Sequence, residues 1–564
     1  MAVLMRRTGE RTAFCACALA LFAVPLRVDG QILGASEAPG GPDLPRWLTE
    51  WSPLKGISDL PRELPGAEVS LPALLTLPAP RVGMFWSAGN PGALAFETSD
   101  AYAQIRAAHK RFSGEYRRPL DAGNESHTGG SAAGWKTLGT GGAAIGRVVV
   151  ERLHRTGNAH ADAVLPFSSN PFTVLDTLGD ALASTVIRLE GAGGWRLGNL
   201  GVGLGVGFEG REVRTEASPV PRQDRVSASG LAAGLAYHIA GGAFRLGVFG
   251  RRAQTAQTVY MYGYAENSLA YMLSGYYEPL PMELSPWGSR RVWRRFDRVA
   301  WAYGFSVGGR VSGVEWTGFA QLERAAEEQF IDEYANDPPT DDWDANGWTL
   351  GFAAQRILTK SRILVTVSAR YAQLDGETLR MDLDEVNFTV SESAAHVTGE
   401  VRLLPRSGWG AAVQVAVGRE GRKRRDVLAR VGSDLKHWAP ALSVEISRTL
   451  PRGFAVSAAG GISQHVPWGD IPAPPAMSYA YQTWIAPELS LYGTKAWSRT
   501  GALTLVWLAR DGVSLWAQGK LAFLSPQTGH THLQFQPEGS RTRSRIEVGV
   551  TMGGRANGGR GSSS

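Results

Sequence analysis

Apolar and polar residues alternate with a period of two through most of the chain, from about residue 99 to residue 554. In the clearest run, residues 199–211, every second position is apolar: Leu200, Val202, Leu204, Val206 and Phe208. The positions between them carry glycine or charge: Gly201, Gly203, Gly205, Gly207, Glu209 and Arg211. Because successive side chains of a strand point to opposite sides, such a run predicts a strand with one apolar face and one small or charged face.

The connections between these runs alternate in length. Short turns are predicted at residues 240–242, 312–313, 359–360, 405–408, 451–453 and 511–512. Long irregular stretches lie between them, at residues 155–182, 213–224, 257–297, 331–346, 376–390, 422–436, 468–496 and 526–540. Short turns at one rim and long loops at the other are typical of a transmembrane β-barrel. The pattern therefore predicts an all-β fold, a large antiparallel barrel of about 18 strands of roughly 10–15 residues, with 16 strands as the alternative.

A soluble all-β fold is the competing interpretation of the same alternation. Strands of sandwiches and propellers are usually about five or six residues long, and the runs here are about twice that length. A propeller also predicts a repeat of about 40–50 residues with a shared motif, and the loops of this chain share no motif. In a barrel that crosses a bilayer, the closed ladder satisfies the backbone hydrogen bonds, so the apolar face meets lipid and the other face lines the lumen.

The first 30 residues have the features of a signal peptide. Three arginines form a basic start: Arg6, Arg7 and Arg11. An apolar core follows from Thr12 to Leu26, and small residues before Gln31 suit cleavage at that point. An N-terminal membrane anchor is the alternative, but the apolar core is short for a span. We expect the chain to be secreted across the inner membrane of a Gram-negative bacterium and to end in the outer membrane.

Three further segments follow the signal peptide. Residues 31–98 are rich in proline, which opposes regular ladders, and are expected to form a periplasmic segment or a plug folded into the lumen. Residues 99–554 are expected to form the barrel, and residues 555–564 a disordered tail. Both cysteines, Cys15 and Cys17, lie in the signal peptide, so the mature chain is expected to contain no disulfide and no cysteine-based site.

The chain resembles uncharacterised outer-membrane β-barrel proteins that are known only as families of unknown function. The resemblance covers roughly residues 80–554 and rests on the glycine-bounded hairpins and on the loop from Ser169-Asn170-Pro171-Phe172 to Asp176. The chain is also similar, more faintly, to fatty-acid-transporter-like barrels, which carry an Asn-Pro-Ala box before the first strand. The matching run here is Gly89-Asn90-Pro91-Gly92-Ala93-Leu94, with glycine where that box has alanine. The second resemblance implies a hydrophobic solute.

Charged residues of both signs recur on the predicted inner face. Those selected as lumen-lining are Glu209, Arg211, Arg245, Arg251, Arg310, Glu315, Arg370, Glu400, Arg402, Arg545 and Glu547. One interpretation is a water-filled pore whose field selects ions or polar solutes. The other is a network of salt bridges that fills the barrel. The pore is favoured because many inward positions, such as Gly201, Gly203 and Gly304, are small and are expected to leave space.

One acidic segment matches the opening of a calcium loop. Asp342, Asp344 and Asn346 stand at alternate positions before a glycine, as in Asp-x-Asp-x-Asn-Gly. The closing glutamate is missing, because position twelve of the motif is Ala353. A solvated acidic loop is the favoured interpretation, so no cofactor is expected, with Ca²⁺ at Asp342, Asp344 and Asn346 as the alternative.

These observations favour a passive function. The expected function is a channel or solute-translocating, porin-like barrel, and not an enzyme. The alternatives are a plugged binding or scaffold barrel that serves an uptake or secretion complex, and a barrel enzyme that modifies lipid. The expected partners are outer-membrane lipid, the barrel-assembly machinery and a solute of undetermined polarity. The net charge is only +6 and the basic residues are scattered, so no nucleic-acid partner is expected.

Overall fold

The structure is a computed structural model of the chain. The residues that it describes are 90–96, 102–117, 122–139, 141–157, 173–176, 181–215, 222–239, 243–262, 268–273, 279–284, 291–331, 339, 341–358, 363–380, 384–403, 408–427, 430–468, 486–509, 513–527 and 539–553. The predicted signal peptide, residues 31–89, the Ser169–Phe172 run and the C-terminal tail lie outside the described residues, so the expectations for them stay predictions.

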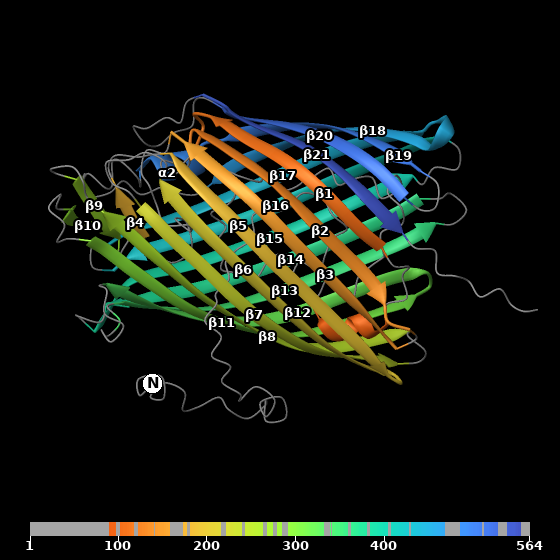
Figure 1. Ribbon diagram of the computed structural model, residues 1–564, viewed down its shortest axis with the longest axis horizontal. Coiled ribbons are helices and arrows are strands. Elements are labelled where there is room, and N and C mark those ends of the chain that lie inside the picture. Colours follow the sequence, from red (N-terminus) through yellow and green to blue (C-terminus); the bar gives the residue numbers. More distant parts are fainter. Residues whose placement is uncertain are drawn as a thin grey trace, which may run out of the picture.

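Eighteen antiparallel strands form one closed barrel (Figure 1). In order around the wall they are β1 (Tyr102–Gly114), β2 (Asn124–Thr137), β3 (Gly142–Thr156), β5 (Leu182–Leu197), β6 (Leu200–Thr215), β7 (Arg222–Ile239), β8 (Phe244–Tyr262), β11 (Arg291–Val311), β12 (Val314–Ile331), β13 (Asp341–Leu358), β14 (Ile363–Arg380), β15 (Glu385–Leu403), β16 (Trp409–Asp426), β17 (Val431–Thr449), β18 (Phe454–Trp468), β19 (Ala496–Leu508), β20 (Val513–Pro526) and β21 (Arg541–Gly553). The wall closes where β1 pairs with β21, from Tyr102 opposite Gly553 to Gly114 opposite Arg541. The predicted fold class and strand number are confirmed, and the 16-strand alternative is wrong.

The strands are longer than the sequence pattern predicted. β11 has 21 residues, and β13 begins at Asp341, inside a stretch predicted to be irregular through residue 346. Similarly, β14 and β15 extend to Arg380 and from Glu385, where a loop over residues 376–390 was predicted. The error arises because the apolar alternation stops at the edge of the lipid band, whereas backbone pairing continues in polar sequence beyond it.

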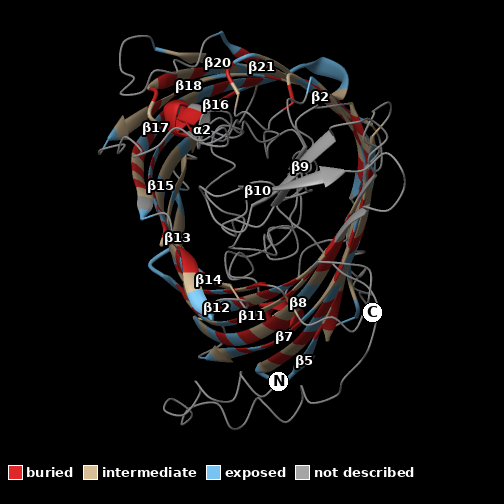
Figure 2. Ribbon diagram, turned by 90° about the vertical axis from the view of Figure 1, so that its left-hand side faces the viewer, coloured by how far each residue is buried: buried red, intermediate tan, exposed pale blue. Residues whose placement is uncertain are grey.

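The two rims differ as predicted, except that the loops predicted at residues 376–390 and 422–436 are short connections, residues 381–384 and 427–430. Consecutive strands join at one rim through short turns, such as Ser312-Gly313, where both residues have positive φ, the backbone that two-residue hairpins require. Another short turn contains the 3₁₀ helix η6 (Pro451–Gly453). The opposite rim has the long connections, and three of their segments, β4 (Thr173–Asp176), β9 (Ser268–Leu273) and β10 (Pro279–Leu284), form a separate small sheet. Figure 1 shows this small sheet at the same end of the barrel, and Figure 2 shows α2 (Ala486–Tyr492) inside the wall.

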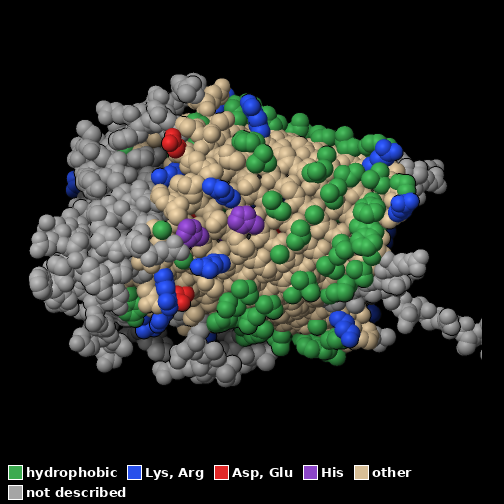
Figure 3. Space-filling view, turned by 45° about the horizontal axis from the view of Figure 1, so that its top comes forward, with side chains coloured by type: hydrophobic (Ala, Val, Ile, Leu, Met, Phe, Trp, Pro, Cys, Tyr) green, Lys and Arg blue, Asp and Glu red, His purple; other side chains and the backbone are tan. Residues whose placement is uncertain are grey.

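Large exposed apolar side chains cover the outside of the wall. Leu204 is 51% exposed, whereas the next residue, Gly205, is buried. Figure 3 shows these hydrophobic side chains spread over the part of the wall nearer the short-turn rim. Trp195, Tyr237 and Trp507 are among the exposed aromatic residues, whereas Trp516 is buried against Ala455 and Val506. None of the helices that the structure describes is long and apolar enough to cross a bilayer.

Candidate functional site

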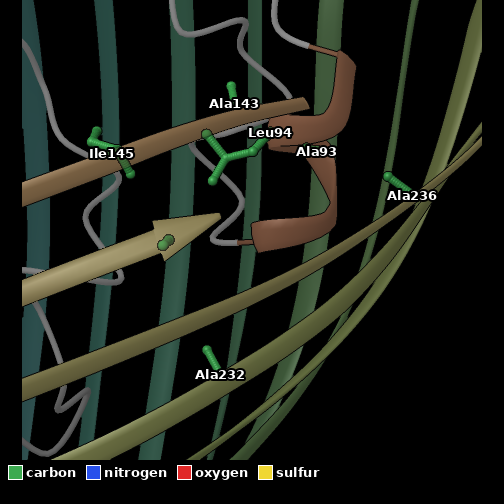
Figure 4. Packing of buried hydrophobic residues seen from close by; sticks show 7 residues of the cluster. Ala93, Leu94, Ala143, Ile145, Ala232 and Ala236 are labelled. Atoms are coloured by element: carbon green, nitrogen blue, oxygen red, sulfur yellow. The ribbon is translucent and has the colours of Figure 1, made fainter. Parts of the chain in front are cut away.

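A short helix lies against the inside of the wall near the short-turn rim. This 3₁₀ helix, η4 (Pro91–Phe96), directly precedes β1 and contacts β3, β5, β6, β7 and β8 (Figure 1). Leu94 is completely buried, and with Ala93 it packs on small apolar side chains of the wall: Ala143, Ile145, Ala192, Ala232 and Ala236 (Figure 4). The end of the segment predicted as periplasmic or plug-forming is therefore fixed to the inner wall.

Asn90 begins this helix and also attaches it to the wall. The backbone N–H of Gly92 donates to Asn90 Oδ1 at 2.9 Å, and the N–H of Ala93 donates to the Asn90 carbonyl at 3.2 Å. The side-chain oxygen thus satisfies a helix N–H that has no partner in its own turn. The Asn90 Nδ2 group donates to the carbonyl of Leu235 in β7 at 2.8 Å. Asn90 is fully buried, so these bonds are made out of contact with water.

Four glycines of the wall allow the helix to approach the backbone of the strands. A Cβ added at Gly203 would lie 2.1 Å from the Pro91 carbonyl oxygen, and one at Gly234 would lie 2.0 Å from Asn90 Oδ1. Gly194 and Gly201 meet the same helix at 2.7 and 2.5 Å. Backbone contact of this closeness requires glycine. We name Gly194, Gly201, Gly203 and Gly234 the glycine seat.

The glycine seat corrects one expectation. Gly201 and Gly203 were expected to leave the lumen open, but η4 occupies the space beside them. The space beside Gly304 is occupied by Phe249 instead: a Cβ at Gly304 would lie 2.1 Å from the Phe249 ring. The seat also explains the departure from the Asn-Pro-Ala box: a Cβ at position 92 would lie 2.6 Å from the Gly234 carbonyl oxygen, so alanine does not fit this wall.

Aromatic and cationic groups cover the far end of the helix. The ring of Phe96 stacks on His238 of β7, with 3.5 Å between ring centroids and 17° between planes. Arg196 of β5 holds its guanidinium 5.4 Å from the centroid of the same Phe96 ring. Cation–π contact of this kind adds to the attachment of η4.

The eleven residues predicted to line the lumen lie on the strand faces opposite the exposed apolar side chains. Three ion pairs join predicted residues to each other: Arg245 Nη1 with Glu315 Oε1 at 3.6 Å, Arg402 Nε with Glu400 Oε1 at 2.6 Å, and Arg545 Nη2 with Glu547 Oε1 at 2.5 Å. Others pair with further charged residues of the inner face: Glu209 with Arg188, and Arg251 with Glu323 at 3.3 Å. Arg211 and Arg370 are half-buried, and Arg310 is exposed beside the short-turn rim.

Two histidine-containing clusters on the same face were missed. Glu420 Oε1 is 3.4 Å from His396 Nε2, and Glu420 Oε2 is 3.3 Å from His437 Nε2. The His437 ring is 4.5 Å from that of His465, whose Nε2 lies 3.0 Å from the Tyr492 carbonyl oxygen and so connects β18 to α2. In the second cluster, His127 contacts Glu125 and Glu151. The first cluster draws its side chains from four strands and the second from two, so the sequence shows only that each residue points inward.

The acidic segment forms a strand and not a loop. Asp342, Asp344 and Asn346 occupy alternate positions on one face of β13, and Gly347, where the calcium motif requires a sharp turn, continues the same strand. An extended strand separates alternate residues by about 7 Å and does not turn them around one ion. Within the described part of the chain, no group of three or more His, Cys, Asp or Glu is arranged to hold a metal ion.

Comparisons with known proteins place the chain in a family and show its similarity to several barrels of known structure. A model described as "Family of unknown function (DUF6850)" matches residues 91–552. No curated protein matches the chain. The copper transporter OprC is 10% identical, with 80% of each chain covered and a TM-score of 0.37. The siderophore receptor PiuA from Acinetobacter baumannii is 7% identical, with 80% of this chain and 82% of that chain covered and a TM-score of 0.37. A deletion mutant of the monoaromatic hydrocarbon channel TodX is 10% identical, with 82% and 92% covered and a TM-score of 0.28.

Proposed function

This chain belongs to the DUF6850 family of unknown function, and from that premise we propose that it is a solute-translocating β-barrel of the outer membrane. The observation that carries the proposal is the charged inner face of a closed 18-stranded wall. Barrels of 16–18 strands are wide enough for an aqueous channel. Charged side chains of both signs on that face keep water in the lumen and give a solute polar partners along its path.

The rims support one orientation of the barrel. Transmembrane barrels place short turns in the periplasm and long connections outside the cell. Helix η4 and the start of β1 lie at the short-turn rim, so the segment that precedes them would enter from the periplasm. The small sheet of β4, β9 and β10 would then lie at the external mouth.

The glycine seat supports a second candidate, a plugged barrel that binds a solute or a partner. In that case the attachment of η4 through Asn90 and the glycine seat holds the preceding residues in or beside the lumen. Both candidates share the same wall and differ in whether the full-length protein conducts.

Conductance in planar bilayers distinguishes the candidates. Purified full-length protein is compared with a variant that lacks residues 31–80, after both are shown to be folded by heat-modifiable mobility on gels and recovery from the outer-membrane fraction. Stepwise conductance of the full-length protein supports the channel. Conductance only after the deletion supports the plugged barrel. Silence of both folded forms rejects translocation of ions through this lumen.

A further inference from the structure

A collar of aromatic and basic side chains surrounds part of the outer wall on the side of the long connections. The guanidinium of Arg419 lies 5.7 Å from the Trp438 ring centroid and 5.2 Å from that of Trp468. On neighbouring strands, the rings of Trp348 and Tyr371 are 4.8 Å apart. Aromatic rings with polar partners are favoured where lipid tails meet headgroups. The collar therefore indicates the outer edge of the lipid band.

A charged groove opens on the outer wall immediately beyond this collar. It has a volume of about 610 Å³, and nine of its lining residues are polar or charged: Arg324, Asp344, Asn346, Asp375, Glu377, Thr389, Ser391, Lys423 and Arg425. Side-chain alternation places these residues on the lipid side. Asn346 and Asp344 share a face with Leu350, which is 47% exposed, and Arg324 shares a face with Leu322, which is 67% exposed. The strands that carry the groove, β12 to β16, form one side of the barrel in Figure 2.

Strand register sets the order of charges across the groove. One row runs from Arg324 of β12 through Asn346 and Asp375 to Ser391 and Lys423 of β16. The next row contains Asp344, Glu377, Thr389 and Arg425. Cations thus stand at both sides, and carboxylate, amide and hydroxyl groups lie between them. Within the described residues, Arg324, Lys423 and Arg425 form no ion pair, so their charge is available to a ligand.

This order fits one class of lipid. Lys and Arg bind phosphate through charge-assisted hydrogen bonds. Carboxylate and amide oxygens accept hydrogen bonds from sugar hydroxyls, and Ser and Thr both donate and accept. A headgroup made of sugar with attached phosphates presents hydroxyls at its centre and negative charge at its ends. Nine of the eleven lining residues are polar or charged, so the groove suits a headgroup better than an acyl chain, and a solute in the lumen does not reach it.

We propose that this outer-wall groove binds the headgroup of a phosphorylated glycolipid of the outer leaflet. Arg324 holds phosphate on one side, and Lys423 with Arg425 holds it on the other. Asn346, Asp375 and Ser391 contact the sugar. The site lies outside the lumen, so it would operate whether or not the barrel conducts, and a silent barrel in the conductance experiment would leave it unaffected.

Lipid binding by the full-length protein tests this site. Folded protein in detergent is titrated with purified lipopolysaccharide, and the double variant Lys423→Ala/Arg425→Ala is compared with wild type. We expect the apparent affinity to fall at least about tenfold, since two charge-assisted contacts are removed. Arg419→Ala is the matched control: it removes an outward cation of the same strand that stacks on Trp438 and Trp468 and does not line the groove. Heat-modifiable mobility checks that each variant is folded.

Two further ligands separate the glycolipid from charge alone. Phosphatidylglycerol vesicles test for general attraction to anionic lipid, and inorganic phosphate tests for a soluble anion. Stronger binding of lipopolysaccharide than of either, lost in the double variant and retained in the control, supports the proposal. Equal affinity of wild type and the double variant for lipopolysaccharide overturns it. Equal binding of phosphatidylglycerol and lipopolysaccharide also overturns it, because the sugar contacts would then have no effect.

Discussion

Gly203 faces Pro91 so closely that a methyl group on Gly203 would lie 2.1 Å from the Pro91 carbonyl oxygen. Gly203 belongs to a barrel strand, and Pro91 is the first residue of the helix that precedes the barrel. At this contact the position of the N-terminal helix therefore depends on the absence of a side chain from the wall.

Gly203→Ala is expected to displace η4 while the barrel still assembles. The added methyl group has no space unless the helix moves, and overpacking of this kind costs about 1–3 kcal/mol. Protease cleavage near residues 90–96 should become faster, and the midpoint of chemical unfolding should fall. Gly399→Ala is the control, because a Cβ at Gly399 has no neighbour within 4 Å. Equal resistance of Gly203→Ala and wild type to cleavage would contradict the contact.

Adjacent residues on β6 should differ in their tolerance of charge. Leu204 is on the exposed apolar face and Gly205 on the buried face. Leu204→Arg places a charge in lipid and should impair assembly by about 2–4 kcal/mol near the midplane. Gly205→Arg should leave insertion largely intact, because its side chain enters the charged lumen. Recovery in the outer-membrane fraction and heat-modifiable mobility measure the difference, and equal assembly defects would reject this assignment of faces.

The buried ion pair of Arg188 and Glu209 gives a third prediction. Both side chains are almost completely buried, on neighbouring strands of the wall. Removing one partner of a buried ion pair typically costs about 3–5 kcal/mol, because the other charge stays buried with weaker compensation. Glu209→Ala should therefore lower the free energy of unfolding by about that amount, and Arg188→Met in the same chain should restore part of it.

An exposed pair supplies the control for this measurement. Glu212 and Arg214 also form an ion pair, at 2.7 Å, but both are solvent-exposed. Exposed pairs contribute about 0–1 kcal/mol, so Glu212→Ala should change the free energy of unfolding very little. A loss for Glu209→Ala as small as that for Glu212→Ala would show that water reaches the Arg188–Glu209 pair.

Alternation predicted the fold because it reports directly on the lipid-facing side of each strand. The faces of Leu204 and Gly205 were assigned correctly from their alternate positions along the strand alone, since a closed wall has only two faces. Strand ends were not predictable in the same way: beyond the lipid band the outward face of β13 is polar, so Asp342 and Asp344 resembled a loop. Alternation along one strand does not show which residues of distant strands come into contact. This explains why the contacts of Glu420, His437 and the glycine seat were missed.

The chemistry of Asn90 shows a different limit of the sequence. The run Asn90-Pro91-Gly92 was noted for its resemblance to an Asn-Pro-Ala box, and the reason for its glycine was not apparent. That reason is on β7, 142 positions away in the chain, where the Gly234 carbonyl faces Gly92. A single sequence without its fold contains no signal that connects these two positions.

Asp342 should make the stability of the barrel depend on pH. It lies beyond Trp348, outside the lipid band, with one carboxylate oxygen buried and without a hydrogen-bond partner among the described residues. Burial, followed by the nearby charges of Glu328 and Asp344, raises the pKa of Asp342 to about 6 from its ordinary value of 3.8. The folded protein therefore binds a proton more tightly than the unfolded chain at this residue. Stability is then greatest below about pH 4, falls as the pH rises from about 4 to about 6, and is constant above that range.

Asp342→Asn removes this titration and tests its sign. The amide cannot ionise, so the variant should be more stable than wild type at pH 8, by about 1 kcal/mol or less once solvent screening of a half-exposed group is included. At pH 4, where the wild-type carboxyl is protonated, the two proteins should unfold at the same denaturant concentration. Asp375→Asn provides a control, because the Asp375 carboxylate accepts a hydrogen bond from Gln373 Nε2 at 3.0 Å and is exposed. A variant at position 342 that is less stable than wild type at pH 8 would show that the ionised carboxylate is stabilised by a partner, which reverses the sign of the prediction.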